Sequence, residues 1–207
     1  MEDFNREKHW NNIYQTKALN EVSWYQPNPN TSLGFVKQFN LAKTAKILDV
    51  GGGDSFFVDG LLDLGFVDIT VLDISESALE RAKIRLGTRA NKVKWIVADI
   101  ATVNLSEKFD FWHDRAAFHF LTIEKEIEHY VEMTNLKVNP NGFLVIGTFS
   151  ENGPRKCSGL EIKQYTEATL VETFKDCYRL ESSIIEDHKT PFDTVQNFVF
   201  CSFSKFI

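Results

Sequence analysis

Short apolar segments alternate with helical patterns from Ala45 onward, and this alternation limits the possible folds more than any other feature of the sequence. Apolar runs typical of buried strands occupy residues 46–50, 68–72, 93–98, 109–113 and 143–149. Apolar residues at helical spacing fill residues 55–64, 75–86 and 123–136, with Ser75 placed to cap the second of these helices. Such alternation predicts a parallel sheet with helices on both faces.

The C-terminal part departs from this alternation. A helix is expected around residues 166–174, followed by β-rich runs at 178–186 and 195–205 that a turn near Pro191 joins. Two adjacent strands with a short link pair as a hairpin, so the last strand should run antiparallel to the others. The predicted fold class is α/β: a doubly wound, mostly parallel seven-stranded sheet with an antiparallel last strand, in three layers (α/β/α).

The length of 207 residues and the ordinary share of apolar residues, 43%, fit a single domain with a full core. Residues 27–32 (PNPNTS) break regular structure, and Thr31 or Ser32 can cap a helix that follows. We expect residues 1–42 to form an N-terminal helical arm or lid on a core of residues 43–207. The arm contains the aromatic residues Trp10, Tyr14, Trp24 and Tyr25.

Charge and cysteine content exclude several classes of function. The formal net charge of −6 gives no general attraction to phosphate backbones, so nucleic-acid binding is not expected. The three cysteines are far apart and form no CxxC pair, so we expect no metal site and reduced thiols, as in the cytoplasm. The charged N-terminus does not resemble a signal peptide, and no apolar run approaches a membrane span.

Acidic residues and glycines stand where three successive strands end. The first strand runs through Asp49 into Gly51, Gly52 and Gly53, the second ends at Asp73, and the third leads to Asp99. In an open α/β sheet, ligands bind beyond the carboxyl ends of the strands. An acidic residue about 20 positions after a glycine turn suits ribose hydroxyls. The pattern therefore predicts a site for a nucleoside cofactor.

The glycine turn distinguishes three kinds of nucleotide site. A dinucleotide site normally has a final glycine at the position of Phe56. Its absence disfavours a nucleotide-binding oxidoreductase, which stays open as an alternative. A P-loop is excluded because no lysine follows the glycines at the required place. Asp49 would repel a pyrophosphate but suits a cationic ligand with an amino group and a sulfonium. That ligand is S-adenosyl-L-methionine.

With these motifs, the chain from about Lys43 onward resembles the class I (seven-stranded, Rossmann-like) S-adenosylmethionine-dependent methyltransferases. LDVGGGDS resembles the first motif of that family, TVLDIS the ribose-binding second strand, and VADI the adenine-binding third strand. FDFWHDRAAFHFL and NPNGFLVIGTF resemble the fourth and fifth strands. A departure is Asp54-Ser55, where the family often has a small residue followed by glycine.

The resemblance implies a role for each matching residue. Asp49 would accept a hydrogen bond from the methionine amino group, and Asp73 would accept from both ribose hydroxyls. Asp99 would accept from the adenine amino group. The remaining implied cofactor contacts are Gly51, Gly52 and Gly53 through the backbone, Ile74 and Ile100 beside the adenine, and His113, Asp114 and Arg115 at the methionine part and the methyl group.

The implied activity is methyl transfer, for which the protein aligns the acceptor and excludes water. If the acceptor carries a proton, the candidate bases are His113, Asp114 and Tyr14, in falling order. Trp24, Tyr25 and Arg115 are the candidate substrate residues. A small-molecule acceptor is preferred, because His-Asp-Arg stands where related protein-lysine methyltransferases usually have Asp-Lys-Gly. A protein (lysine) acceptor and a non-catalytic S-adenosylmethionine-binding protein stay open as alternatives.

Overall fold

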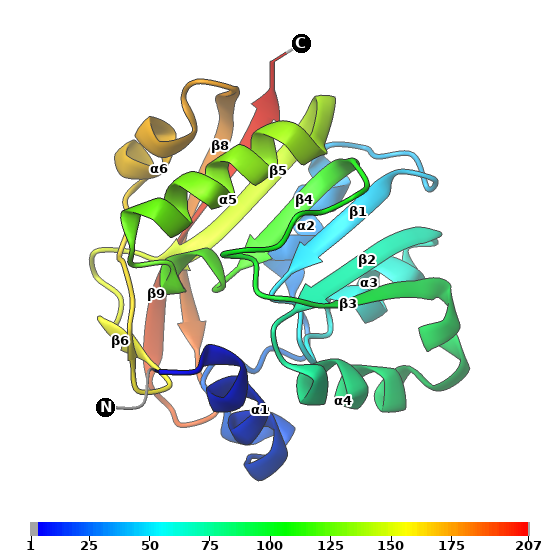
Figure 1. Cartoon of the computed structure of the whole chain (residues 1–207), viewed down its shortest axis with the longest axis vertical. Helices are drawn as coiled ribbons and strands as arrows, with labels where there is room; N and C mark the ends of the chain where they lie inside the picture. Colours follow the sequence, from blue (N-terminus) through cyan, green and yellow to red (C-terminus); the bar gives the residue numbers. More distant parts are fainter. Residues whose placement is uncertain (1–3, 207) are drawn as a thin grey trace.

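The computed structural model describes residues 4–206, and its centre is a seven-stranded sheet (Figure 1). The strand order is β3-β2-β1-β4-β5-β9-β8. The strands are β1 (Lys46–Val50), β2 (Asp68–Asp73), β3 (Val93–Val97), β4 (Phe109–Arg115), β5 (Val138–Phe149), β8 (Tyr178–Lys189) and β9 (Val195–Lys205). Two short strands, β6 (Lys156–Cys157) and β7 (Leu160–Glu161), form a separate hairpin. The predicted seven-stranded α/β fold is confirmed.

The pairing explains which strand ends meet. Strands β3, β2, β1, β4 and β5 pair in parallel, so their carboxyl ends share one edge of the sheet. Strand β9 runs antiparallel between β5 and β8, as the hairpin in the sequence predicted. Strand β4 continues to Arg115, two residues beyond the predicted end, where Arg115 pairs with Gly147 of β5. The extension brings the side chain of Arg115 to the shared carboxyl edge.

Helices cover both faces of the sheet, as Figure 1 shows. The helices are α1 (Arg6–Thr16), α2 (Asn30–Gln38), α3 (Phe57–Asp63), α4 (Glu76–Leu86), α5 (Glu124–Lys137) and α6 (Glu167–Phe174), with the short 3-10 turns η1 (Leu19–Glu21), η2 (Gly87–Lys92) and η3 (Phe118–Phe120). One apolar core joins the sheet to α5 and α6, and a second joins it to α2, α3 and α4. Two apolar faces on one sheet are what the near-continuous apolar strands require.

Side-chain hydrogen bonds cap the first turns of α4 and α6. The Ser75 hydroxyl accepts from the amide of Ala78 at 3.2 Å, which confirms the predicted cap of α4. The Thr166 hydroxyl does the same for α6 with the amide of Thr169. The predicted cap of α2 is wrong, because that helix begins at Asn30 and Ser32 lies inside it. The Ser32 side chain has another partner at the strand ends, described below.

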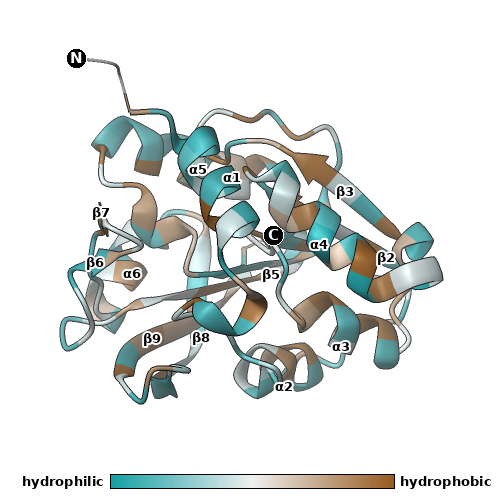
Figure 2. Ribbon diagram, turned by 90° about the horizontal axis from the view of Figure 1, so that it is seen from below, coloured by the Kyte–Doolittle hydropathy of each residue, from teal (hydrophilic) through white to brown (hydrophobic). Residues whose placement is uncertain are grey.

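The two helices of the N-terminal segment lie at different places on the sheet. Helix α1 lies beside the carboxyl ends of the parallel strands and contacts α4, whereas α2 packs on the sheet (Figure 1). The Phe35 ring of α2 lies 6.1 Å from the ring of Phe200 in β9. Figure 2 shows hydrophobic residues along the central strands and hydrophilic ones on the outer helix surfaces. Within residues 4–206, no helix is long and apolar enough to cross a bilayer.

Candidate active site

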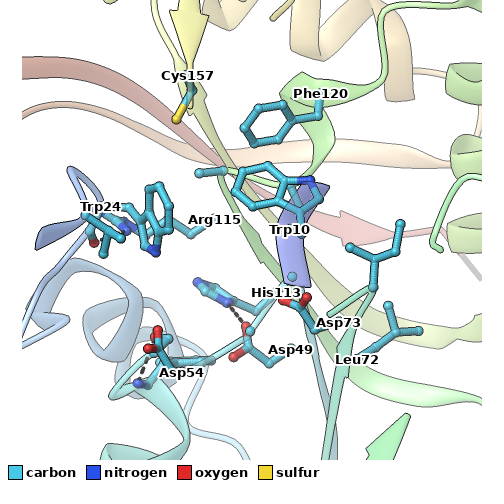
Figure 3. Close-up of a pocket in the computed structure, with 18 of the residues that line it drawn as sticks. Trp10, Trp24, Asp49, Asp54, Leu72, Asp73, His113, Arg115, Phe120 and Cys157 are labelled. Carbon is cyan, nitrogen blue, oxygen red and sulfur yellow. Dashed lines mark hydrogen bonds and ion pairs between the residues drawn. The ribbon is translucent and has the colours of Figure 1, made fainter. Parts of the chain in front are cut away.

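A cavity opens at the carboxyl edge of the parallel strands, roofed by the N-terminal segment (Figure 3). The predicted site residues that line it are Tyr14, Trp24, Tyr25, Asp49, Gly51, Gly52, Asp73, Ile74, Asp99, Ile100, His113 and Arg115. The other two predicted residues do not line the cavity: Gly53 packs against the Tyr14 hydroxyl, and Asp114 does not reach this space. The structure thus gathers residues from four strand ends and the N-terminal segment around one space.

The glycine turn after β1 leaves no room for side chains. Gly51 and Gly53 have φ values of 64° and 47°, which glycine adopts without steric cost. A Cβ on Gly51 would lie 2.5 Å from the Cβ of Ala117, and one on Gly53 would lie 2.9 Å from the Tyr14 hydroxyl. The turn therefore keeps its backbone bare toward the cavity, where a ligand can approach closely.

Asp73 ends β2 inside this space and is shielded from water. One carboxylate oxygen accepts from the amide of Ser75 at 2.8 Å. Burial raises the pKa of Asp73 to about 7, and the amide hydrogen bonds oppose this shift only in part. A carboxylate in this environment gains from hydroxyl donors, because they replace the water that it has lost.

Tyr14 of α1 lies against the same corner. Burial raises the pKa of Tyr14 well above its ordinary value, and the charge of Asp73 adds to the effect. The phenol therefore stays protonated at neutral pH. Tyr14 thus belongs to the cavity wall as a neutral phenol.

His113 joins β4 to β1 and to α2. Its Nδ1 lies 2.7 Å from Asp49 Oδ1, and its Nε2 lies 2.9 Å from Ser32 Oγ. In the tautomer with the proton on Nδ1, the ring donates to Asp49, and Nε2 accepts from the Ser32 hydroxyl. The Phe57 ring lies 4.1 Å from the imidazole and covers it. Both nitrogens are occupied, so His113 has no free lone pair for an acceptor's proton.

The prediction that Asp114 faces the methyl group is wrong, because successive side chains of a strand point to opposite faces. The Asp114 carboxylate accepts from the amides of Ala117 and Phe118 at 2.9 and 3.0 Å. It also accepts from the Tyr130 hydroxyl at 2.8 Å. Burial raises the pKa of Asp114 to about 6, and these donors limit the rise. Asp114 therefore anchors the turn after β4 on the far side of the sheet.

Arg81 of α4 fastens the N-terminal segment to the body. Its Nη1 donates to the carbonyls of Tyr14 and Lys17 at 2.9 and 2.8 Å. Its Nη2 lies 3.0 Å from Asp54 Oδ2, just after the glycine turn. Burial raises the pKa of Asp54, and Arg81 opposes the shift. One guanidinium thus links the end of α1 to the loop that borders the cavity.

Aromatic rings form the wall between the N-terminal segment and the sheet (Figure 3). The Trp10 ring lies edge-on to Trp24 at 5.8 Å and to Phe120 at 5.0 Å. Tyr14 packs on Trp24 at 6.0 Å. Edge-to-face packing of this kind holds large rings in fixed positions. The part of the cavity next to Arg115 therefore has an apolar, aromatic wall.

Several lining residues escape sequence reasoning. Phe120 follows β4 by a short turn, and Gln196 and Phe198 belong to β9. Gln196 and Phe198 reach the cavity because β9 returns antiparallel beside β5 and begins at the carboxyl edge. Gln196 and Phe198 stand two residues apart at the start of β9, a weak signal that could have suggested an inward-facing pair.

The structure shows no metal centre: residues 4–206 contain no group of three histidine, cysteine or acidic side chains placed to hold an ion. His119 is a core residue, and its Nδ1 accepts from the amide of Phe149 at 3.2 Å. His188 is also buried, with Nε2 2.8 Å from the carbonyl of Ser23. Neither histidine lines the cavity.

Comparisons with known proteins give this arrangement its family. Residues 47–142 match the family described as "Methyltransferase domain". The solved structure of the N-methyltransferase NodS from Bradyrhizobium japonicum, with bound S-adenosyl-l-homocysteine, superimposes with a TM-score of 0.70 at 13% identity and covers 97% of this chain and 99% of that one. The matched domain and the seven-stranded fold together support a class I S-adenosylmethionine-dependent methyltransferase.

Two curated methyltransferases are similar to this one in sequence. "EEF1A lysine methyltransferase 2" of Danio rerio is 24% identical over 188 residues, which cover 84% of this chain and 75% of that protein. "Malonyl-[acyl-carrier protein] O-methyltransferase" of Anoxybacillus flavithermus is 30% identical over 106 residues, 51% of this chain and 39% of that protein. The first name specifies lysine methylation and the second methylation of an oxygen. Both proteins are therefore methyltransferases, but their substrates differ.

The cofactor of this methyltransferase is S-adenosyl-L-methionine, and the residues present fit it. When bound, it supplies a methyl group activated on a sulfonium. Gly51 and Gly52 line the cavity without side chains, and the buried carboxylate of Asp73 suits ribose hydroxyls. Asp99 Oδ1 accepts from the amide of Ala101 at 2.8 Å, which orients that side chain at the edge where the adenine is expected. Asp49, held by His113, offers an acceptor for an amino group.

Proposed function

We propose that this methyltransferase acts on a small organic molecule that enters beneath the N-terminal segment. The observation that carries the proposal is the guanidinium of Arg115, which lines the cavity without an ion-pair partner within residues 4–206. A cation in an aromatic pocket repels a lysine ammonium and attracts an anionic acceptor, and it does not repel an uncharged one. The charge of Arg115 thus favours a small acceptor over a lysine side chain.

We propose the following roles for the other residues. Asp73 accepts from the ribose hydroxyls, Ile74 and Ile100 pack beside the adenine, and Asp99 accepts from its amino group. Asp49 binds the methionine amino group while His113 fixes its orientation. Trp24 and Tyr25 exclude water and hold the acceptor in line with the methyl group.

Proton transfer by a side chain has no place in this proposal. His113 is engaged at both nitrogens, Asp114 lies on the far side of the sheet, and the Tyr14 phenol stays protonated. Burial likewise raises the pKa of Cys157, so this lining residue is a neutral thiol. We therefore propose that the acceptor atom enters with a free lone pair and needs no base from the protein.

The test separates the acceptor classes by mass. The purified protein is incubated with methyl-labelled S-adenosylmethionine and, separately, with the protein fraction and the low-mass fraction of an extract of the cells that make it. We expect label in compounds of the low-mass fraction, and none with the Asp73→Ala variant. Asp68→Ala, at the opposite end of β2, is the matched control and should keep activity.

The second candidate is a protein-lysine methyltransferase, which the 188-residue similarity to the Danio rerio protein favours. Label in the protein fraction alone would establish it and refute the first proposal. Bound cofactor with no label in either fraction would instead establish a non-catalytic binding protein. We further propose that the protein acts in the cytoplasm, because Cys157, Cys177 and Cys201 are free thiols.

A further inference from the structure

Arg115 has hydrogen-bond donors that the protein does not use. Its Nη1 donates to the carbonyl of Trp24 at 3.3 Å, which is long for such a bond. Its Nε and Nη2 are sealed from water and have no hydrogen-bond partner within residues 4–206. Buried polar groups are nearly always paired, so a guanidinium with two free donors needs an explanation.

The surroundings of Arg115 compensate its charge only in part. The Phe198 ring lies 4.9 Å from its central carbon, which gives a cation–π contact. Burial lowers the pKa of Arg115 to about 10, and the more distant carboxylate of Glu186 opposes the shift. Glu186 accepts from Gln26 at 3.4 Å and makes no ion pair with Arg115. The guanidinium therefore stays charged at neutral pH while its Nε–Nη2 edge lacks an anion.

The free atoms lie on one edge of the guanidinium. Nε–H and one Nη2–H point in the same direction, a fork whose spacing matches the two oxygens of a carboxylate. A second unpartnered group lines the same cavity, the buried side-chain oxygen Oε1 of Gln196. Gln196 and Phe198 share a face of β9, because they are two residues apart. Gln196 therefore lies next to the ring on which Arg115 stacks.

We infer that the Nε–Nη2 edge of Arg115 binds a carboxylate of the methyl acceptor, and that the acceptor is a small organic acid with an apolar or aromatic body. The inference rests on the proposed function and names its substrate class. The aromatic wall of Trp24, Phe120 and Phe198 supplies the apolar contacts, and the Gln196 amide faces a polar group of the same ligand. The Trp24 carbonyl contacts only Nη1, so it does not occupy the two atoms of the fork.

The test uses benzoate and benzamide, two probes of nearly equal shape that differ in charge. Each is titrated by calorimetry into the protein saturated with S-adenosylhomocysteine. We expect benzoate to bind at least about tenfold more tightly than benzamide, since a paired buried charge strengthens the hydrogen bonds. Equal affinity for the two probes, or no binding of benzoate, overturns the inference, and this comparison needs no variant.

Two variants should change the preference for benzoate in opposite directions. Arg115→Gln should abolish the preference for benzoate. Glu186→Gln should preserve or increase the preference, because it removes the carboxylate that competes for the guanidinium. A preference that survives in Arg115→Gln refutes the inference. If S-adenosylhomocysteine itself does not bind, the proposed function fails, whereas cofactor binding without a charge preference refutes only the carboxylate.

Discussion

The Nδ1 atom of His113 lies 2.7 Å from Oδ1 of Asp49, in a hydrogen bond between neighbouring strands that is closed to water. The second ring nitrogen is bound to Ser32 of α2. The imidazole therefore orients the carboxylate that we assign to the methionine amino group, and it ties α2 to the sheet. This role differs from that of a general base, which the sequence suggested for His113.

Replacing His113 should therefore affect cofactor binding as well as stability. His113→Ala leaves Asp49 without its donor, and we expect the affinity for S-adenosylmethionine to fall about tenfold. The free energy of unfolding should fall by about 2–4 kcal/mol, because a buried ring and two hydrogen bonds are lost. Ser32→Ala is the control, since it removes only the partner of Nε2 and should spare cofactor affinity. Unchanged affinity in His113→Ala would leave the orienting role without support.

The raised pKa of Asp73 predicts a pH-dependent stability. An aspartate whose folded pKa of about 7 exceeds its unfolded value stabilises the fold below the unfolded pKa and loses that contribution as pH rises through 7. In the ligand-free protein, Asp73→Asn should gain stability over the wild type, by up to about 2–3 kcal/mol more at pH 8 than at pH 5. Denaturant unfolding at the two pH values measures this difference. An equal gain at both would contradict the assigned environment.

Asp73→Asn should also lower the affinity for S-adenosylmethionine. The ionised carboxylate accepts from two ribose hydroxyls, whereas an amide oxygen accepts less strongly. Wild-type affinity for S-adenosylmethionine should therefore decline as the pH falls below 7, and Asp73→Asn should bind weakly and without this dependence. Calorimetric titrations across the pH range test the relationship. A pH-dependent affinity that persists in the variant would point to another group.

Asp114 should matter for folding and not for catalysis. Asp114→Ala removes the acceptor for the amides of Ala117 and Phe118, and we expect a loss of about 1–3 kcal/mol in the free energy of unfolding. Asp114→Asn keeps an oxygen for these amides, so it should transfer label to the low-mass fraction at close to the wild-type rate. A collapse of label transfer in a folded Asp114→Asn protein would restore the residue as a base.

Arg81 should control how long the cofactor stays bound. Arg81→Ala removes three contacts that hold the end of α1 over the cavity, so the cofactor should dissociate about tenfold faster. Stopped-flow tryptophan fluorescence can follow this step, because Trp10 and Trp24 line the cavity. The control is Arg89→Ala, which removes a surface pair with Asp63 and should leave the rate unchanged. Identical rates in all three proteins would argue against a fastened N-terminal segment.

Much of the fold could be predicted because its signals are local. The run 46–50 is apolar on both faces, which marks a covered parallel strand, and Ser75 caps α4 where its sequence position suggests. Asp49, Asp73 and Asp99 meet at one edge because parallel strands share their direction. Sequence patterns that repeat with the period of the secondary structure thus located the cofactor side of the cavity.

The acceptor side could not be predicted in the same way. Its residues come from distant elements, and their roles depend on which face each side chain takes. His113 and Asp114 are consecutive in β4, so their side chains point to opposite faces of the sheet. His113 lies in the cavity wall, whereas Asp114 lies on the other face and contacts Tyr130. Gln196 and Phe198 join Arg115 only because β9 inserts between β5 and β8. Such neighbours follow from tertiary pairing, which no local pattern specifies.

The most direct test of the central claim is a calorimetric titration of the purified protein with S-adenosylmethionine, S-adenosylhomocysteine and NAD. The account predicts micromolar binding of the first two and none of NAD, because the glycine turn lacks a final glycine and Asp49 opposes a pyrophosphate. Binding of NAD alone, or of none of the three, would contradict the assignment of the cavity and of every residue placed around it.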